Sequence, residues 1–414
     1  MHAEPPAASP ARDARELRAL LAFVCFVTLF EGYDLLIINL ALPHLGRDFG
    51  ADGQTLASAV GLINVGTILA FLPLRLADRY GRRRVFLFAV LGYTVFTMLS
   101  ACAVGLYDFV AWQCLARMFM VTEIGVGAII LTEEMPARWR GAAVTLMFAL
   151  SLSGGILGAV VFPLMVDTAL GWRLLYLLGG AALPVLLWYW PRLRETQRFA
   201  ARTGGDFMPV WTALRTVLAA PYRRRAVAGA TIWFTVNAWS SSCLFFFAYY
   251  VTQERGWDTA AASHALTLGY TFAILGYATA GPMLDLAGRR LTALAYFSLG
   301  AASAWVCFTA TDPRHITMAY ATVLAMQALW PIAATITSEI FPTAIRGTAN
   351  GIVNNLLGRT GMVFAPALVG GLSSLLGSVG EAVALVSLLP LAVLPIIYLL
   401  VAETRGQELE RIAS

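Results

Sequence analysis

The sequence contains no lysine, and charged residues of every kind are scarce. All 29 basic residues are arginines, and the charged types together make up only 13% of the 414 residues. A soluble globular domain carries about 25% charged residues, so the chain is not an ordinary soluble domain. The net charge of +5 does not indicate a nucleic-acid partner, because the arginines gather in the connections between apolar segments.

Cysteine is also rare, and no group of residues has the spacing of a metal site. Five cysteines fall in apolar segments, and we interpret them as small buried residues: Cys25, Cys102, Cys114, Cys243 and Cys307. The sequence has no nucleophile elbow and no metal-ligand cluster, so we expect no enzyme, no metal and no cofactor, with protons as the coupling ion. The first apolar segment contains Glu31 and Asp34, which argues against a cleavable signal peptide.

Long apolar runs take the place of the missing charge. Hydrophobic residues make up 59% of the chain, and its mean hydropathy is +0.71. Inside a bilayer every backbone polar group must be satisfied within the protein, so apolar runs of roughly 20 residues predict spanning helices. We predict an all-α membrane protein with twelve transmembrane helices, at 18–42, 55–76, 85–105, 107–131, 142–165, 170–190, 224–252, 260–282, 291–309, 315–338, 348–373 and 381–401.

Arginine placement predicts the orientation of these spans. Connections after odd-numbered spans carry only Arg47, Arg173, Arg255 and Arg314, and the other connections carry many more. The positive-inside rule then places both termini in the cytoplasm. The predicted parts are a cytoplasmic tail (1–17), a six-helix bundle (18–191), a cytoplasmic linker (192–223), a second six-helix bundle (224–401) and a cytoplasmic tail (402–414). In the linker, a short surface helix and a plain connection both remain open.

A short charged motif occurs twice, half a chain apart. Asp-x-x-Gly-Arg-Arg begins at Asp78 and again at Asp285, a shift of 207 residues. Two further motifs recur at shifts of 206 and 208 residues, Glu-x-x-Pro-x-x-x-Arg-Gly at Glu133 and Glu339 and Glu-Thr at Glu195 and Glu403. Three motifs therefore indicate one internal duplication, with six predicted spans in each copy.

These motifs resemble those of the major facilitator superfamily, and the resemblance covers essentially the whole chain. Gly32-Tyr33-Asp34 and the ending Glu403-Thr404-Arg405-Gly406 are similar to the branch that holds sugar porters, aromatic-acid and metabolite proton symporters, and animal organic-ion transporters. The resemblance implies two six-helix bundles around a central site, alternating access by rocking of the halves, and a monomer in the inner membrane of a bacterium.

The chain departs from the family pattern at two places. Leu74 stands where the first motif usually opens with glycine, although the second copy keeps Gly281. Predicted span 7 contains Asn237 and a run of three serines in place of the glutamine pair of sugar porters. A sugar substrate is therefore the weaker expectation.

Five ionisable residues lie inside predicted spans, where inserting a charge costs roughly 2.5 to 3.5 kcal/mol. They are Glu31, Asp34, Arg117, Glu123 and Arg359. Helical rise places Asp34 and Arg117 at a similar depth, ~12 Å below the outer surface, so they can form an ion pair that protonation of Asp34 would release. The resemblance to proton-coupled sugar porters implies the same role for this Asp and Arg.

Glu31 and Glu123 complete the predicted proton-coupling group. Glu31 lies one turn from Asp34 on the same helix face, and two ionised carboxylates at that spacing repel each other, which suits a group that binds and releases a proton. For Glu123, a share in proton coupling and a structural pair with Arg117 both remain open.

Arg359 is the candidate substrate-binding residue of the second half. It lies near the middle of predicted span 11, and a fixed guanidinium can hold a carboxylate with paired hydrogen bonds. An ion pair with Glu31 or Glu123 is the alternative that remains open. Polar and aromatic residues at a similar depth are further candidates for substrate contacts: Asn237, Trp239, Gln327, Trp330 and Asn355.

Charged residues at the predicted cytoplasmic helix ends form a third candidate set. We predict that they form ion pairs that lock the two halves together on the inside and separate when the protein opens inward. The set comprises Asp78, Gly81, Arg82, Glu133, Arg140, Glu195 and Arg198 in the first half, and Asp285, Gly288, Arg289, Glu339, Arg346, Glu403 and Arg405 in the second.

The sequence thus predicts a secondary active transporter that imports a small organic anion, aromatic or another carboxylate, together with protons. The expected partners are the small-molecule substrate and the lipid bilayer, and no nucleic acid. Three alternatives remain open: a proton-driven exporter of drugs or metabolites, a sugar or polyol symporter, and a transport-dead sensor of the same fold.

Overall fold

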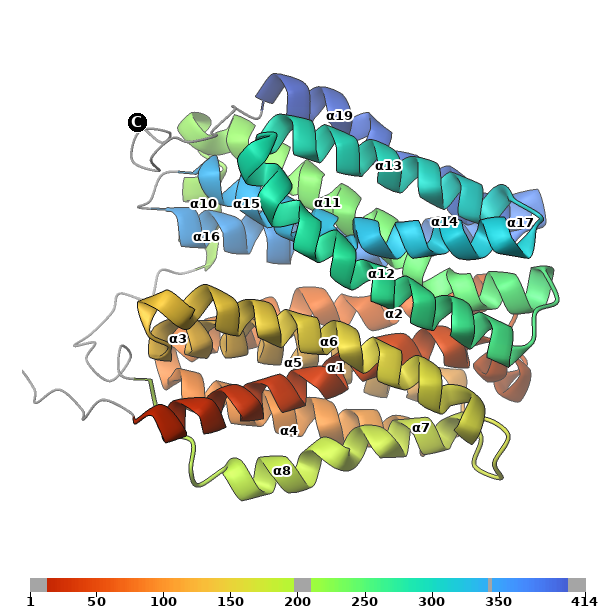
Figure 1. The fold of residues 1–414 in the computed structure, drawn as a ribbon, viewed down its shortest axis with the longest axis horizontal. Coiled ribbons are helices and arrows are strands. Elements are labelled where there is room, and N and C mark those ends of the chain that lie inside the picture. Colours follow the sequence, from red (N-terminus) through yellow and green to blue (C-terminus); the bar gives the residue numbers. More distant parts are fainter. Residues whose placement is uncertain (1–12, 197–209, 342–344, 401–414) are drawn as a thin grey trace, which may run out of the picture.

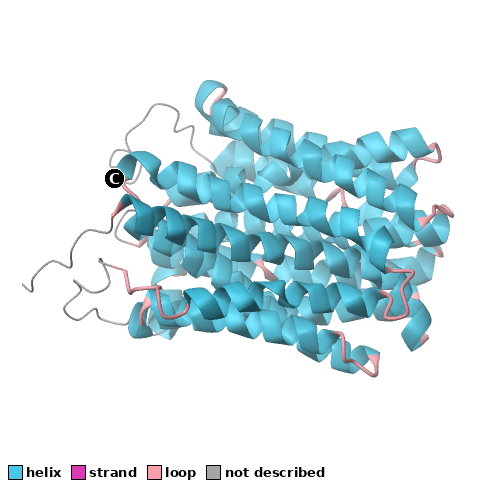
Figure 2. Ribbon diagram, turned by 60° about the horizontal axis from the view of Figure 1, so that its bottom comes forward, coloured by secondary structure: helices cyan, strands magenta, loops and turns pink. Residues whose placement is uncertain are grey.

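The structure is a computed structural model that describes residues 13–196, 210–341 and 345–400, and these residues are helical almost throughout (Figures 1 and 2). The predicted all-α class is confirmed. Ten of the described helices or helix pairs are long and apolar enough to cross a membrane. The predicted number of twelve spans and the cytoplasmic position of the termini stay predictions.

The first half of the chain forms the lower bundle in Figure 1. Its helices are α1 (Ala14–Phe49), α2 (Gly53–Leu69), α3 (Phe71–Tyr80), α4 (Arg82–Ser100), α5 (Leu106–Glu134), α6 (Ala137–Met165), α7 (Trp172–Leu178), the 3-10 turn η1 (Gly179–Ala181) and α8 (Ala182–Tyr189). Asp13 and Asp52 cap α1 and α2 by accepting backbone N–H bonds in the first turn, as good N-cap residues do.

The second half forms the upper bundle in Figure 1. It consists of α10 (Val210–Val217), α11 (Ala220–Tyr249), the π-helix η2 (Tyr250–Glu254), α12 (Thr259–Leu286), α13 (Arg289–Thr309), α14 (Pro313–Ala325), the 3-10 turn η3 (Met326–Ala328), α15 (Leu329–Glu339), α16 (Arg346–Asn350), the π-helix η4 (Gly351–Gly358), α17 (Thr360–Leu376), α18 (Val379–Val386) and α19 (Leu389–Leu400).

Two predicted spans, 224–252 and 260–282, coincide with α11 and α12, which are not among the ten apolar helices. They are 30 and 28 residues long, so they are long enough to span a membrane and differ from the ten in hydropathy. Both carry many polar residues along an otherwise apolar sequence, such as Ser240, Ser241 and Ser242 in α11 and Ser263 and Thr267 in α12, and these lower their hydropathy. Polar helices of this kind are expected where a helix lines an internal site.

Several predicted spans are not continuous α-helices. Span 170–190 is interrupted by η1, span 315–338 by η3, and span 348–373 by the eight-residue π-helix η4. Span 55–76 is divided between α2 and α3, and span 381–401 between α18 and α19. Hydropathy measures length and apolarity only, so it could not predict these interruptions. π-helical segments are rare and occur frequently at functional sites, which makes η4 of particular interest.

The two bundles contact each other mainly in one half of their length. We call the end that carries Arg82–Arg84 and Arg289–Arg290 the arginine end, and the opposite end the far end. Helix α2 packs against α17, α6 against α12, and α1 against α11. Between described residues, two hydrogen bonds join the bundles: Asn64 Nδ2 donates to the Met362 carbonyl at 3.1 Å, and the Ala248 N–H donates to Asn39 Oδ1 at 3.3 Å.

The buried apolar core follows the same division. One cluster of buried side chains runs from the far part of the first half into the second half, and includes Tyr33, Leu56 and Trp239. A separate cluster, which includes Phe23 and Phe86, occupies the arginine end of the first half alone. Among the described residues, the core is therefore continuous between the halves only toward the far end.

Small residues allow α2 and α17 to approach closely. A Cβ atom added to Gly61 would lie 3.0 Å from the Val363 carbonyl oxygen, and one on Gly370 would lie 2.9 Å from the Ala57 Cβ. Leu74, where the family motif has glycine, instead packs inside its own half, 2.5 Å from a Cβ built on Gly125. The unusual leucine therefore does not prevent the two halves from packing together.

Candidate functional site

The close crossing of α1 and α6 places Glu31. A Cβ on Gly32 would lie 1.7 Å from the Ser151 carbonyl oxygen, and one on Gly154 would lie 1.8 Å from the Leu29 carbonyl oxygen. Only glycine fits at both positions. This contact brings Ser151 Oγ to Glu31, to which it donates a hydrogen bond of 2.7 Å.

Asp34 and Arg117 are both buried and lie near each other, but they are not in ion-pair contact. Their exposed fractions are 2% and 3%. The charge of Arg117 acts on both Asp34 and Glu31, yet the described side chains include no N–O contact between Asp34 and Arg117 within the 4.0 Å limit of an ion pair. Asp34 Oδ1 and Arg117 Nη2 have no hydrogen-bond partner. The similar depth of the two residues allowed a direct ion pair between Asp34 and Arg117, but this pair is not formed in this conformation.

Arg117 reaches across the boundary between the halves. Its guanidinium carbon lies 5.7 Å from the centre of the Phe245 ring, which belongs to α11 in the second half. A cation over an aromatic face at this distance is stabilised electrostatically. Arg117 is thus positioned to respond when the two halves move.

Arg359 follows the π-helix η4 directly and contacts aromatic and amide groups. Its guanidinium carbon lies 5.9 Å from the Trp330 ring centre, and its Nε donates to Asn355 Oδ1 at 3.2 Å. Trp330 packs edge-on against Trp233, with ring centres 5.5 Å apart. No hydrogen bond joins the terminal nitrogens of Arg359 to a described residue, so no group in the described part of the chain competes with a ligand for them.

Glycines on both sides fix the position of Arg359. A Cβ on Gly358 would lie 2.4 Å from the Trp233 Cβ, and one on Gly361 would lie 2.2 Å from the Phe234 carbonyl oxygen. The Gly-Arg-x-Gly sequence therefore packs this segment against α11 at very short range, which leaves the arginine side chain little freedom in where it emerges.

The structure brings four of the five predicted charges together, three from the first half and Arg359 from the second. Glu31 experiences the charges of both Arg117 and Arg359, and the two arginines act on each other as like charges. Tyr270 and Tyr277 of α12 also lie within electrostatic reach of Glu31. We call Glu31, Asp34, Arg117 and Arg359 the central charge group.

Sequence reasoning missed several neighbours of this group: Ser151, Phe245, Tyr270 and Tyr277. A signal exists for Ser151, because it belongs to the run Ser151-Leu152-Ser153-Gly154, which is typical of close helix packing. The tyrosines carried no recognisable pattern, since their proximity to Glu31 depends on how the two halves dock.

Glu123 lies inside the first half, within electrostatic reach of Glu31. Its exposed fraction is 0%. Thr28 Oγ1 lies 3.1 Å from its Oε1, and its Oε2 has no hydrogen-bond partner. The described residues form no ion pair between Glu123 and Arg117, so the structural pair considered from the sequence is not present in this conformation.

Of the predicted substrate contacts, Trp330 and Asn355 lie beside Arg359, while three others lie inside the second bundle. Trp239 is fully buried, 3.2 Å from a Cβ built on Gly300. Asn237 Nδ2 donates to the Trp233 carbonyl at 2.7 Å, and Gln327 Oε1 accepts from Ser240 at 2.7 Å. Asn237 and Gln327 each keep one buried polar atom without a partner.

Four of the predicted gate residues form two ion pairs, one within each half. Arg82 pairs with Glu133 at 3.3 Å, and Arg289 pairs with Glu339 at 3.0 Å. Among the described side chains, no ion pair joins the two bundles in this conformation, and the lock between the halves stays a prediction. Each ion pair instead braces its own bundle at the arginine end.

The remaining gate positions are partly described. Glu195 accepts the backbone N–H of Arg83 at 3.1 Å, and Asp285 is an exposed second partner of Arg289 at 3.3 Å. Gly81 and Gly288 have φ values of 99° and 90°, which favour glycine at both turns. The side chains of Asp78, Arg140 and Arg346, and all of Arg198, Glu403 and Arg405, lie outside the described residues.

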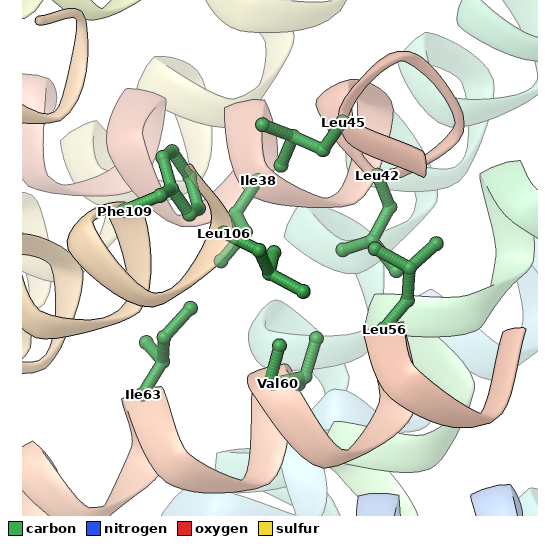
Figure 3. A pocket seen from close by; sticks show the side chains of 9 residues that line it. Ile38, Leu42, Leu45, Leu56, Val60, Ile63, Leu106 and Phe109 are labelled. Atoms are coloured by element: carbon green, nitrogen blue, oxygen red, sulfur yellow. The ribbon is translucent and has the colours of Figure 1, made fainter. Parts of the chain in front are cut away.

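A small pocket between α1, α2 and α5 is unrelated to the central charge group (Figure 3). Side chains such as Ile38, Leu42, Val60, Leu106 and Phe109 line it, and all nine lining residues are apolar. A space of this kind offers no group that could orient a charged ligand.

Two bundles that are copies of one another, that close together toward one end, and that hold charged side chains where they meet, define a secondary transporter. The chain belongs to the Major Facilitator Superfamily, whose family model matches residues 24–249 and 230–412. The resemblance drawn from the motifs is therefore confirmed, and the chain is a membrane transporter and not an enzyme.

Individual relatives are similar over much or part of the chain. It is 24% identical over 360 residues to a putative niacin/nicotinamide transporter, NiaP, of Bacillus subtilis (strain 168), which covers 86% of this chain and 89% of the relative. It is 30% identical over 173 residues to the 4-hydroxybenzoate transporter PcaK of Acinetobacter baylyi, covering 41% of this chain and 37% of that one.

The fold also matches solved structures. The inward open conformation of the xylose transporter XylE from E. coli superimposes with a TM-score of 0.75 at 17% identity, covering 96% of this chain and 99% of that one. At this level of identity the similarity shows the fold alone.

Proposed function

We propose that this protein imports a small organic acid, with an aromatic or other carboxylate group, together with protons. The observation that carries the proposal is the position of Arg359, held by glycines and backed by Trp330, with terminal nitrogens free for a ligand. A guanidinium in this setting favours a planar carboxylate, and the neighbouring tryptophan offers a face for an aromatic ring. Relatives named as niacin and 4-hydroxybenzoate transporters support this substrate class.

In the proposed cycle, Glu31 and Asp34 carry the proton and Arg117 responds to it. Both acids lie beside Arg117, which touches Phe245 of the other half. Protonation of either acid weakens its attraction for Arg117 and leaves that cation freer to attract the substrate anion. Proton and substrate thereby favour the same conformation, which is the thermodynamic requirement for coupled transport.

The orientation and setting follow the arginine distribution. We propose that the arginine end faces the cytoplasm, that twelve helices span the inner membrane of a bacterium, and that a single chain is the working unit. With the halves in contact toward the far end, this conformation is then closed toward the outside.

Uptake into proteoliposomes tests the proposed function. Purified protein is reconstituted, and uptake of labelled 4-hydroxybenzoate and nicotinate is compared with and without an inward proton gradient. We expect the gradient to accelerate uptake of at least one acid and a protonophore to abolish the acceleration. Equal uptake under both conditions would contradict proton coupling, and faster export from preloaded vesicles under the opposite gradient alone would support the exporter alternative.

A further inference from the structure

We propose that Glu123 keeps its proton throughout the transport cycle and serves as a hydrogen-bond donor that joins α5 to α1, while the coupling proton is carried by the central charge group. The second part rests on the proposed proton-coupled function. The first part depends only on the surroundings of Glu123.

No cation compensates Glu123 among the described residues. The titratable groups near it are Glu31 on α1, whose charge is of the same sign, and Tyr93 on α4. The Tyr93 hydroxyl donates to the Val27 carbonyl at 3.2 Å, so its proton is already used. An ionised carboxylate that is fully buried, without a cation and with one oxygen unpartnered, would be strongly unfavourable.

The hydrogen-bond geometry around Thr28 also indicates a proton on Glu123. A hydroxyl group has one hydrogen to donate. Thr28 Oγ1 lies 2.9 Å from the Val24 carbonyl and 3.1 Å from Glu123 Oε1. The carbonyl can only accept, so when Thr28 donates to it, Glu123 must supply the hydrogen for the second contact. A protonated Glu123 satisfies both contacts at once.

A coupling group must have different surroundings in the two states of the cycle, because only then does the movement change its affinity for a proton. Glu31 and Arg117 meet this condition, since Arg359 and Phe245 of the other half lie near them. The described contacts of Glu123 come only from its own bundle. Rocking of the two bundles as rigid bodies leaves those neighbours in place. When Glu31 loses its proton, its negative charge disfavours an ionised Glu123 further, so Glu123 keeps its proton in both states.

The glutamic acid therefore acts as a positioning residue for α1. Its donor holds Thr28, which lies one turn before Glu31 on the same helix. Because Glu31 belongs to the central charge group, a fixed donor at Glu123 stabilises the segment of α1 that carries the coupling acids.

Infrared spectroscopy of the purified protein tests the protonation state without any transport measurement. Wild type and Glu123→Gln are compared in the carboxylic-acid carbonyl region over the full pH range in which the protein stays folded. We expect a wild-type band that does not change with pH and that is missing from Glu123→Gln. Titration of the band that is lost in Glu123→Gln, or spectra without any such lost band, would overturn the proposal, whereas titrating bands that persist in the variant belong to Glu31 and Asp34.

Transport assays test the second part with matched variants. Glu123→Gln keeps a donor of similar shape, so we expect uptake within about twofold of wild type and an unchanged dependence on the proton gradient. Glu123→Leu removes the donor and should lower both melting temperature and uptake, and Glu31→Gln should abolish gradient dependence. Loss of gradient dependence in Glu123→Gln would refute the inference. If wild-type uptake does not depend on the proton gradient, the proposed function is wrong. The infrared result still shows whether Glu123 is protonated.

Discussion

Arg82 and Arg289, 207 positions apart in the sequence, make the same two contacts. Arg82 Nη1 donates to the Ala77 carbonyl at 3.0 Å and Arg289 Nη1 to the Leu284 carbonyl at 2.9 Å, each five residues earlier. Each arginine also donates from Nε to a glutamate of its own bundle at 3.3 Å. The internal duplication is thus preserved in individual hydrogen bonds, and the paired motifs have a structural role that the sequence alone did not define.

The first prediction concerns these braces. Glu133→Gln and Glu339→Gln each remove the buried carboxylate that pairs with a largely buried arginine, so we expect each to destabilise its bundle by ~3 kcal/mol. Asp285→Asn is the matched control, because Asp285 is 77% exposed and an exposed pair contributes little. Thermal unfolding in detergent should show a clearly lower melting temperature for both glutamate variants and almost no change for Asp285→Asn. Equal effects of all three variants would argue against the braces.

The second prediction concerns the proposed substrate anchor. Arg359→Ala removes a charge-assisted hydrogen-bond donor, so binding of the transported acid should weaken roughly 10- to 100-fold. Arg359→Lys keeps the charge but loses the paired donors, so its affinity for the acid should lie between that of wild type and that of Arg359→Ala. Ligand-induced thermal stabilisation measures both, with the melting temperature of the free proteins as the control for folding. Undiminished binding by Arg359→Ala would remove this residue from the site.

The third prediction concerns the crossing of α1 and α6. Gly32→Ala places a Cβ against the Ser151 backbone, which cannot move aside easily, so we expect loss of folded protein or separation of Ser151 from Glu31. Gly371→Ala is the control, because nothing lies within 4 Å of a Cβ built there. Expression level and size-exclusion profile provide the measurement. A well-folded and active Gly32→Ala protein would show that the helices are not so close.

The fourth prediction separates proton coupling from substrate binding. Asp34→Asn cannot release a proton, so gradient-driven uptake should fall at least roughly tenfold, since a tenfold change corresponds to the loss of only 1.4 kcal/mol of driving force. Exchange of internal for external substrate needs no net proton movement and should continue. Both assays use the same vesicles across a series of pH values. Parallel loss of exchange would assign Asp34 to substrate binding instead.

Much of the fold could be predicted because its determinants are local. Apolar run lengths identified the helices, and the repeated Asp-x-x-Gly-Arg-Arg motif revealed two related halves. Local patterns could not predict the interruption of span 11 by η4, because a π-helix has the same hydropathy as an α-helix. They also could not predict that Arg82 pairs within its own bundle, since a charge at a helix end has no visible partner in the sequence.

The candidate site was predicted in part for a similar reason. Burial cost identified Glu31, Asp34, Arg117 and Arg359 as unusual charges, and that criterion needs no knowledge of the fold. The same criterion grouped Glu123 with them, although it lies apart inside one bundle. Which charges meet depends on helix rotation and on docking of the halves, and neither is encoded in residue spacing alone.

The contacts that close the far end have a consequence for the energetics of the cycle. Two asparagine hydrogen bonds, from Asn64 and Asn39, join the bundles there, and each contributes about 1 kcal/mol net. A ligand that prefers one conformation by only a few kcal/mol shifts such an equilibrium strongly. One carboxylate bound to one arginine is of that order. The polar part of the far-end closure is therefore of the same order as the free energy that one bound substrate molecule supplies.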